Sequence, residues 1–155
     1  MLKKIALVGY ILLLAACSSS GEQVLREPQT MTRTDYIEVN YKMQPHIKKA
    51  KLSLPYVKGV YQKGLEEGDK LYLTIKLSEP DKSFELVEIS VDDWYANKIM
   101  GRIASQLFVL QHYHQGDMIS FDEEDVLDWT LVKKDGSKEG GYVRKFLQGC
   151  AAKRR

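Results

Sequence analysis

The feature that most constrains the fold is a strict alternation of side chains over residues 71–77. The apolar members are Leu71, Leu73, Ile75 and Leu77, and the side chains between them are Tyr72, Thr74 and Lys76. Because successive side chains of a strand point to opposite faces, this period of two predicts a strand buried on one face only. Residues 79–82, Glu-Pro-Asp-Lys, have turn chemistry. The chain is therefore expected to reverse direction after this strand.

Further strands are predicted after this turn. In the next segment Phe84 and Leu86 share one face, whereas Val87 and Ile89 share the other, which suggests a bulge or a sharply twisted strand. Additional strands are predicted within residues 117–121, 127–131 and 142–147, separated by acidic and Gly-rich turns. The sequence therefore predicts a mostly antiparallel, barrel-like meander sheet.

Helical periodicity is confined to the region before these strands. Residues 43–50 carry apolar side chains at helical spacing, although Pro45 limits that helix to a start near its first turn. Ser53 followed by Pro55 predicts a fresh helix start, with apolar side chains on one face as far as Leu65 and with Gly64 and Gly68 marking the end. We therefore expect an α+β fold in which one or two short N-terminal helices precede the sheet.

Residues 1–16 carry the features of a secretory signal. Two lysines precede an apolar run from Ile5 to Leu14, and small residues follow it. The run is well below the roughly 18 residues that a membrane span requires. Cys17 directly after Leu-Ala-Ala resembles the lipobox of bacterial lipoproteins, which implies a diacylglycerol on the thiol, cleavage before Cys17 and N-acylation. Ser18 resembles the sorting signal of Gram-negative lipoproteins for the outer membrane, with the body facing the periplasm. The alternatives are an ordinary signal peptide and a short membrane helix.

The predicted processing leaves one domain with a linker before it and a tail after it. Residues 17–40 are the acylated cysteine and flexible linker, residues 41–148 the domain, and residues 149–155 a basic tail. Both lysines of the signal leave and no acidic residue does, so the formal charge falls from +2 to 0. A neutral domain disfavours nucleic-acid binding. With the other cysteine acylated, Cys150 is expected to be a free thiol or to form an intermolecular bridge.

Short motifs follow one another in a fixed order, namely Gly101-Arg102-Ile103, Gly116-Asp117-Met118-Ile119, Asp128-Trp129 and Gly140-Gly141-Tyr142-Val143-Arg144. This order resembles the bacterial domain of unknown function family 2314, the YegJ-like proteins, over roughly residues 44–147. The family has no assigned reaction, so the resemblance implies a fold and a class more than a function. The sequence departs from the family pattern at residues 104–106, where an Asn-x-Pro element is common. It departs again after Glu88, where a His and a Trp are common.

Three clusters are candidates for chemistry. His112 and His114 would share one face of a strand and could chelate a metal there, but they would diverge on a helix. We expect neither a metal site nor another cofactor. The acidic residues 122–125 lack the spacing of a calcium loop and are interpreted as a solvated turn. Asp128 is expected to face outward or to bond a neighbouring backbone amide, and Arg144 is expected to pair with it across the sheet, as a structural pair or a ligand contact.

The sequence favours a non-catalytic module that binds another protein of the envelope. No Gly-x-Ser-x-Gly element and no Ser/His/Asp order is visible. The membrane is expected as a second partner through the lipid on Cys17, and nucleic acid is not expected as a partner. One alternative is an immunity or inhibitor protein against a toxin that acts in the periplasm. The other is an envelope hydrolase, which would require a convergent Ser, His or carboxylate pocket.

Overall fold

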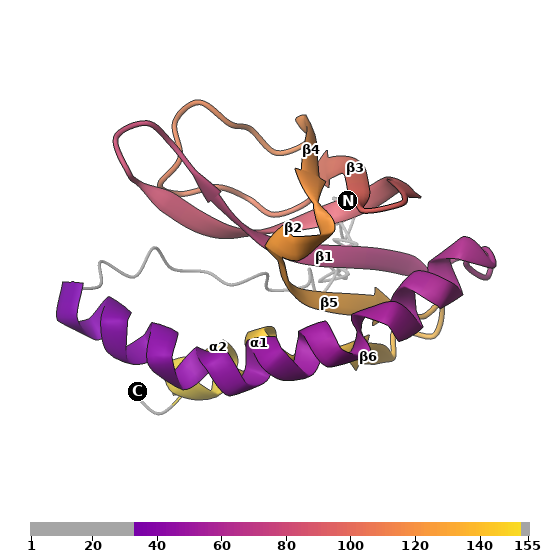
Figure 1. Ribbon diagram of the computed structural model, residues 1–155, viewed down its shortest axis with the longest axis horizontal. Helices are drawn as coiled ribbons and strands as arrows, with labels where there is room; N and C mark the ends of the chain where they lie inside the picture. Colours follow the sequence, from indigo (N-terminus) through magenta and orange to yellow (C-terminus); the bar gives the residue numbers. More distant parts are fainter. Residues whose placement is uncertain (1–32, 153–155) are drawn as a thin grey trace, which may run out of the picture.

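The structure, a computed structural model, describes residues 33–152 and consists of two helices and one six-stranded antiparallel sheet (Figure 1). This confirms the predicted α+β class. The predicted signal and Cys17 lie outside the described residues. The elements follow one another as α1 (Arg33–Gln62), β1 (Lys70–Ser78), β2 (Phe84–Tyr95), β3 (Lys98–Ile103), β4 (Met118–Asp122), the 3-10 turn η1 (Glu123–Asp125), β5 (Val126–Val132), β6 (Lys138–Gly140) and α2 (Tyr142–Ala152).

The sheet is open, so the predicted barrel-like closure is wrong. The strands lie in the order β4-β3-β2-β1-β5-β6, in which the first four form a meander and β5 returns to the free side of β1. The edge strands β4 and β6 are only five and three residues long and each pairs with one neighbour. A barrel would require these two edges to pair with each other.

The main core lies between α1 and one face of the sheet. Leu71, Leu73 and Ile75 of β1 are buried, which confirms the predicted alternation. They belong to one cluster with Leu54 of α1 and Trp129 of β5. The indole Nε1 of Trp129 also donates a hydrogen bond of 3.0 Å to the hydroxyl of Ser53 on α1. Helix and sheet are therefore held together by apolar burial and by specific polar contacts, of which this is one.

The helix α1 is continuous over 30 residues, whereas the sequence predicted one or two short helices. Pro45 and Pro55 both lie inside it, and both are exposed. Each proline removes the N–H that would bond the carbonyl group four residues before it, and does so on the exposed side of the helix. The buried side chains before and after the prolines, such as Ile47 and Val57, share the inner face. Packing along this face keeps the two predicted pieces in one helix.

Residues 142–147, predicted as a strand, begin α2 instead. Val143 of α2 forms a second apolar cluster with Met43 and Ile47 of α1, and Leu86 of β2 packs against it. This packing explains why Leu86 is apolar although it lies on the opposite face of the strand from Val87 and Ile89. The pairing of β2 with β1 is regular from Phe84 to Ser90, and the register shift of β2 against β3 comes later, between residues 91 and 93.

The two helices extend past the predicted domain (41–148) at both ends. The helix α1 begins at Arg33, inside the segment predicted as linker (17–40), and α2 extends through Ala152, into the predicted tail (149–155). Within residues 33–152, neither helix combines the length and the apolar character that crossing a bilayer requires.

Candidate functional site

Asp128 lies beneath the beginning of α2. Its side chain is fully buried, and Oδ1 accepts hydrogen bonds from the backbone N–H groups of Trp129 (2.9 Å) and Tyr142 (3.0 Å). The other oxygen, Oδ2, accepts from the N–H groups of Val143 (2.8 Å) and Arg144 (3.2 Å). Three of these donors belong to the first turn of α2, where N–H groups have no partner inside the helix. The carboxylate therefore caps α2 from a neighbouring strand.

The surroundings of Asp128 have two opposing effects on its pKa. Burial is the larger effect and raises the pKa above its ordinary value, whereas the four backbone N–H donors lower it. Because the carboxyl group is buried and both oxygens are engaged, it has no open path to a substrate. We therefore assign Asp128 a structural role.

The side chain of Arg144 pairs with Glu88 on β2. Its Nη2 donates to Glu88 Oε1, and the two side chains are 17% and 15% exposed. The predicted pair of side chains between Asp128 and Arg144 does not form, and only the backbone N–H of Arg144 contacts Asp128. Thr74 of β1 is the register partner of both Asp128 and Glu88, so the three lie in one row across the sheet. A helix rather than a strand carries Arg144, and its side chain reaches the far end of this row.

Two glycines join the end of β6 to α2. Gly140 and Gly141 have φ values of +75° and +65°, which glycine adopts without strain. A Cβ on Gly140 would lie 2.2 Å from the carbonyl oxygen of Trp129 and 2.6 Å from its ring. The N–H of Gly141 donates to the same carbonyl at 2.7 Å. The motifs Asp128-Trp129 and Gly140–Arg144 are therefore one structural unit, which we call the α2 junction.

Residues 104–117, between β3 and β4, form a loop whose backbone is held by two carboxylates. Glu85 on β2 accepts hydrogen bonds of 2.9 to 3.1 Å from the N–H groups of residues 108–110. Glu79, whose side chain is 2% exposed, accepts from residues 111 and 112 at 2.7 and 2.6 Å. Five consecutive N–H groups are thus bound, and we call residues 104–117 the clamped loop. The hydrogen bonds from the loop outweigh burial and lower the pKa of Glu79.

The clamped loop presents two apolar side chains to solvent. Phe108 and Val109 are 38% and 40% exposed, and we call them the apolar tip. The next residue, Leu110, is buried in the main core and ties the loop to the sheet. Sequence reasoning missed this loop. The apolar run at residues 107–110, which lies outside every predicted strand, could have indicated a loop with apolar contacts.

The histidines of the clamped loop do not converge. Nδ1 of His112 lies 3.2 Å from Glu79, and Nδ1 of His114 lies 3.6 Å from Asp117. Both side chains are more than three-quarters exposed. Residues 112 and 114 lie in neither a strand nor a helix. Each imidazole therefore faces its own carboxylate, and the strand geometry required for chelation by this pair does not occur.

The comparison with known families covers the α2 junction and the clamped loop together. Residues 40–154 match the family described as an uncharacterized protein conserved in bacteria (DUF2314). The chain belongs to the DUF2314 family. No curated protein and no solved structure matches it. The description of the DUF2314 family assigns no reaction, so arguments about function rest on the geometry of this chain.

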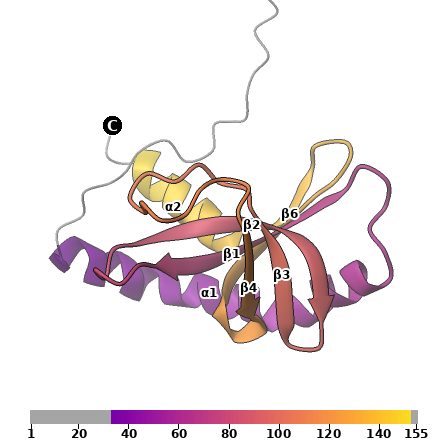
Figure 2. The same ribbon diagram turned by 90° about the horizontal axis from the view of Figure 1, so that it is seen from above.

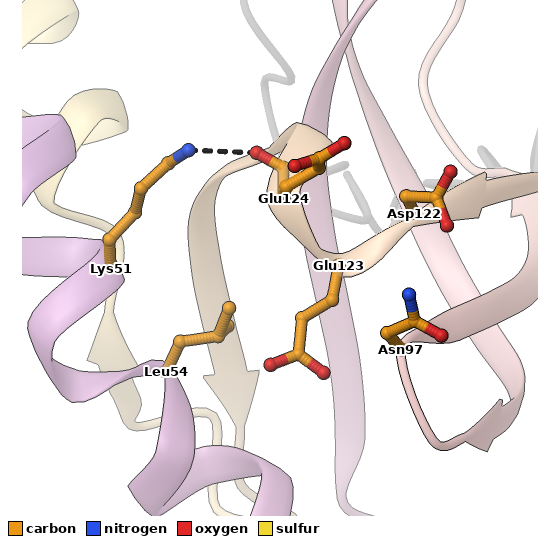
Figure 3. A pocket seen from close by; sticks show the side chains of 6 residues that line it. All are labelled: Lys51, Leu54, Asn97, Asp122, Glu123 and Glu124. Carbon is orange, nitrogen blue, oxygen red and sulfur yellow. Dashed lines mark hydrogen bonds between the residues drawn. The ribbon is translucent and has the colours of Figure 1, made fainter.

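Figure 3 shows an open pocket between α1 and the connection from β4 to β5. Its volume is about 500 Å³, and its lining consists of Lys51, Leu54, Asn97, Asp122, Glu123 and Glu124. The acidic residues 122–125 form the end of β4 and η1. Glu123 pairs with Lys58 and accepts a hydrogen bond of 3.1 Å from the indole of Trp94. In the described part of this DUF2314 protein, no group of three or more His, Cys, Asp or Glu side chains is placed to hold a metal.

A second pocket, of about 330 Å³, lies beside Arg144. Its charged lining residues are Lys70, Glu88, Lys133, Lys134 and Arg144. Much of this charge is compensated, since Arg144 pairs with Glu88 and Lys133 lies 3.3 Å from a carboxylate oxygen of Asp69. The pocket is a weaker candidate for binding than the clamped loop.

Cys150 lies on α2 as a partly buried free thiol.

Proposed function

We propose that this DUF2314 protein is a non-catalytic binding module that presents the apolar tip to a protein partner in the cell envelope. The main support for this proposal is that the carboxylates of Glu79 and Glu85 hold the backbone of the loop through hydrogen bonds. A loop whose backbone is already held in place loses little conformational entropy on binding, so more of the contact energy appears as affinity. Exposed aromatic and aliphatic side chains on such a loop are the groups that anchor protein interfaces.

We further propose that the module is a lipoprotein on the periplasmic face of the outer membrane. The support is the sequence Leu14-Ala15-Ala16-Cys17 after a short apolar run, together with Ser18. Two or three acyl chains on Cys17 would anchor the protein firmly, because each buried methylene contributes about 0.8 kcal/mol. Mass spectrometry of the membrane-extracted protein tests this part. Acyl groups on Cys17 are expected, and an unmodified chain that begins at Met1 would contradict the anchor.

The binding role is tested by affinity purification from membranes with matched variants. Phe108→Ser removes the aromatic side chain of the tip, and Met118→Ser removes a 52% exposed apolar side chain from the edge strand β4. We expect the same partner with the wild-type protein and with Met118→Ser, and at least tenfold less of it with Phe108→Ser, since burying such a side chain contributes about 1.5–3 kcal/mol.

Equal recovery of the partner with all three proteins would contradict binding through the apolar tip. Glu85→Gln provides a second variant, because it weakens the clamp while leaving Phe108 and Val109 in place. If pre-organisation matters, this variant binds more weakly than the wild type. The identity of the partner decides the class of module: a toxin that acts in the periplasm would make the protein an immunity protein.

A further inference from the structure

The outer face of α1 carries an exposed apolar stripe, at one edge of which Tyr56 contacts the sheet through a hydrogen bond of its hydroxyl to Glu139 (3.1 Å) and a tilted ring contact with Trp129. Ile37, Tyr41, Leu52 and Tyr56 are 59%, 79%, 74% and 56% exposed. At 100° per residue these side chains lie within about one third of the helix circumference. They are opposite the buried side chains of the inner face, among which are Met43, Ile47, Ala50, Leu54 and Val57. The helix α1 is therefore apolar on two sides.

Basic side chains outnumber acidic ones in and beside this stripe. The residues of α1 include six Lys or Arg and two Asp or Glu. At the same helical spacing Lys48 falls within the stripe and Lys49 borders it on one side. Lys51 borders it on the other side and also donates to the carbonyl of Glu124 at 2.7 Å. Glu38 falls at the edge of the stripe and pairs with Lys42, so the excess of positive charge comes from the other lysines. An exposed apolar stripe with a border of lysines is the pattern of helices that lie in the plane of a membrane surface.

We propose that the outer face of α1 lies against an anionic phospholipid surface. The lysines complement the phosphate groups, and the stripe reaches the boundary of the acyl chains. A second copy of the chain is a poorer occupant, because two basic faces would meet and repel each other. The length of chain before the helix agrees with a lipid occupant. Cys17, the proposed acylation site, precedes Arg33 by 16 residues, and a random coil of 16 residues, as the composition of a linker predicts, would span roughly 20–24 Å.

This placement fixes the orientation of the domain. In Figure 1 α1 lies along one side of the molecule, and the clamped loop between β3 and β4 lies at the opposite side. Figure 2, viewed from above, shows the same loop in front of the sheet with α1 behind it. With α1 on the lipid surface, the clamped loop, which carries the apolar tip, lies on the side of the domain away from the membrane.

The experiment places a fluorescent label on either side of the molecule. The full chain with Cys17→Ser and Cys150→Ser has no thiol, so Leu52→Cys or Met118→Cys introduces a single one. The label is a polarity-sensitive dye, and the vesicles contain spin-labelled lipids that quench a dye at the membrane surface. One set is phosphatidylcholine alone, and the other contains phosphatidylglycerol as well. We expect quenching at residue 52 on the anionic vesicles, relieved by salt, and little quenching at residue 118.

Two lysine variants in the Leu52→Cys chain separate the contribution of α1 from that of the apolar N-terminal segment. Lys48 lies in the stripe, whereas Lys82 lies in the turn between β1 and β2, and both are exposed. Lys48→Gln should lower the partition coefficient for anionic vesicles about fivefold, as expected for one lysine near an anionic surface, and Lys82→Gln should leave it unchanged.

Equal quenching at residues 52 and 118, or the same result on neutral and anionic vesicles, would overturn the proposal. Burial of the label at residue 52 without vesicles, increasing with protein concentration, would assign the face to a second copy instead. These chains lack Cys17, so the outcome is independent of acylation, which mass spectrometry of the wild-type protein tests separately.

Discussion

At the scale of single residues, carboxylate side chains organise the backbone of this protein. Asp128 binds the first turn of α2, and Glu79 and Glu85 bind the clamped loop. Asp128 stands out in the sequence because it precedes a core tryptophan on a strand. Of its two predicted environments, outward-facing or bonded to a neighbouring backbone amide, the second occurs. The sequence contains no indication of the role of Glu79, since the amides that it binds lie more than 30 residues further along the chain.

The clamp at Glu79 is expected to weaken in acid. The pKa of this carboxyl group lies below its ordinary value of 4.5, so its contribution to stability is present above that value. The contribution is lost as the pH falls through the lower pKa of the folded state. Hydrogen exchange, corrected for the intrinsic effect of pH, should show the amides of residues 111 and 112 protected above pH 4.5 and progressively exposed as the pH falls through the lowered pKa of Glu79.

The amide of Leu131 in β5 serves as the internal control for this measurement, because its protection should remain. In Glu79→Gln the amides of residues 111 and 112 should lack the pH dependence. Unchanged protection of these amides in the wild-type protein throughout the acid range would contradict the clamp.

At the scale of elements, the sequence predicted what depends on local pattern and missed what depends on distant contacts. The strand β1 was predicted because its alternation reports one buried face. The continuity of α1 was missed because Pro45 and Pro55 break the local pattern, while packing on the inner face maintains the helix. The helix α2 was predicted as a strand because its cap comes from Asp128, 14 residues before its first N–H donor. The predicted pair with Arg144 failed for the same reason.

The role of Asp128 in α2 can be tested by stability measurements. Asp128→Ala leaves the N–H groups of the first turn without their acceptor, and we expect the free energy of unfolding to fall by about 2–3 kcal/mol. The control is Asp93→Ala, an exposed position on β2 where a change within about 0.5 kcal/mol is expected. Denaturant unfolding followed by circular dichroism measures both. A loss as small as that of the control would show that the cap contributes little.

At the scale of the whole molecule, the sequence predicted the α+β class and the meander, but the predicted barrel-like closure is wrong because the sheet is open. Closure depends on the lengths and pairing of β4 and β6, and neither strand has a distinctive local pattern. The clamped loop could not be predicted either, because its structure comes from carboxylates on the β1–β2 hairpin. In the proposed arrangement the outer face of α1 contacts lipid, and the apolar tip contacts a protein on the opposite side of the domain.

Photo-crosslinking in intact cells tests this arrangement most directly. A photoreactive amino acid is placed at residue 108 in the apolar tip or at residue 52 on the outer face of α1, in the otherwise unaltered chain. The account predicts a discrete protein adduct from residue 108 and lipid adducts, without that protein, from residue 52. A protein adduct from residue 52 together with none from residue 108 would contradict it.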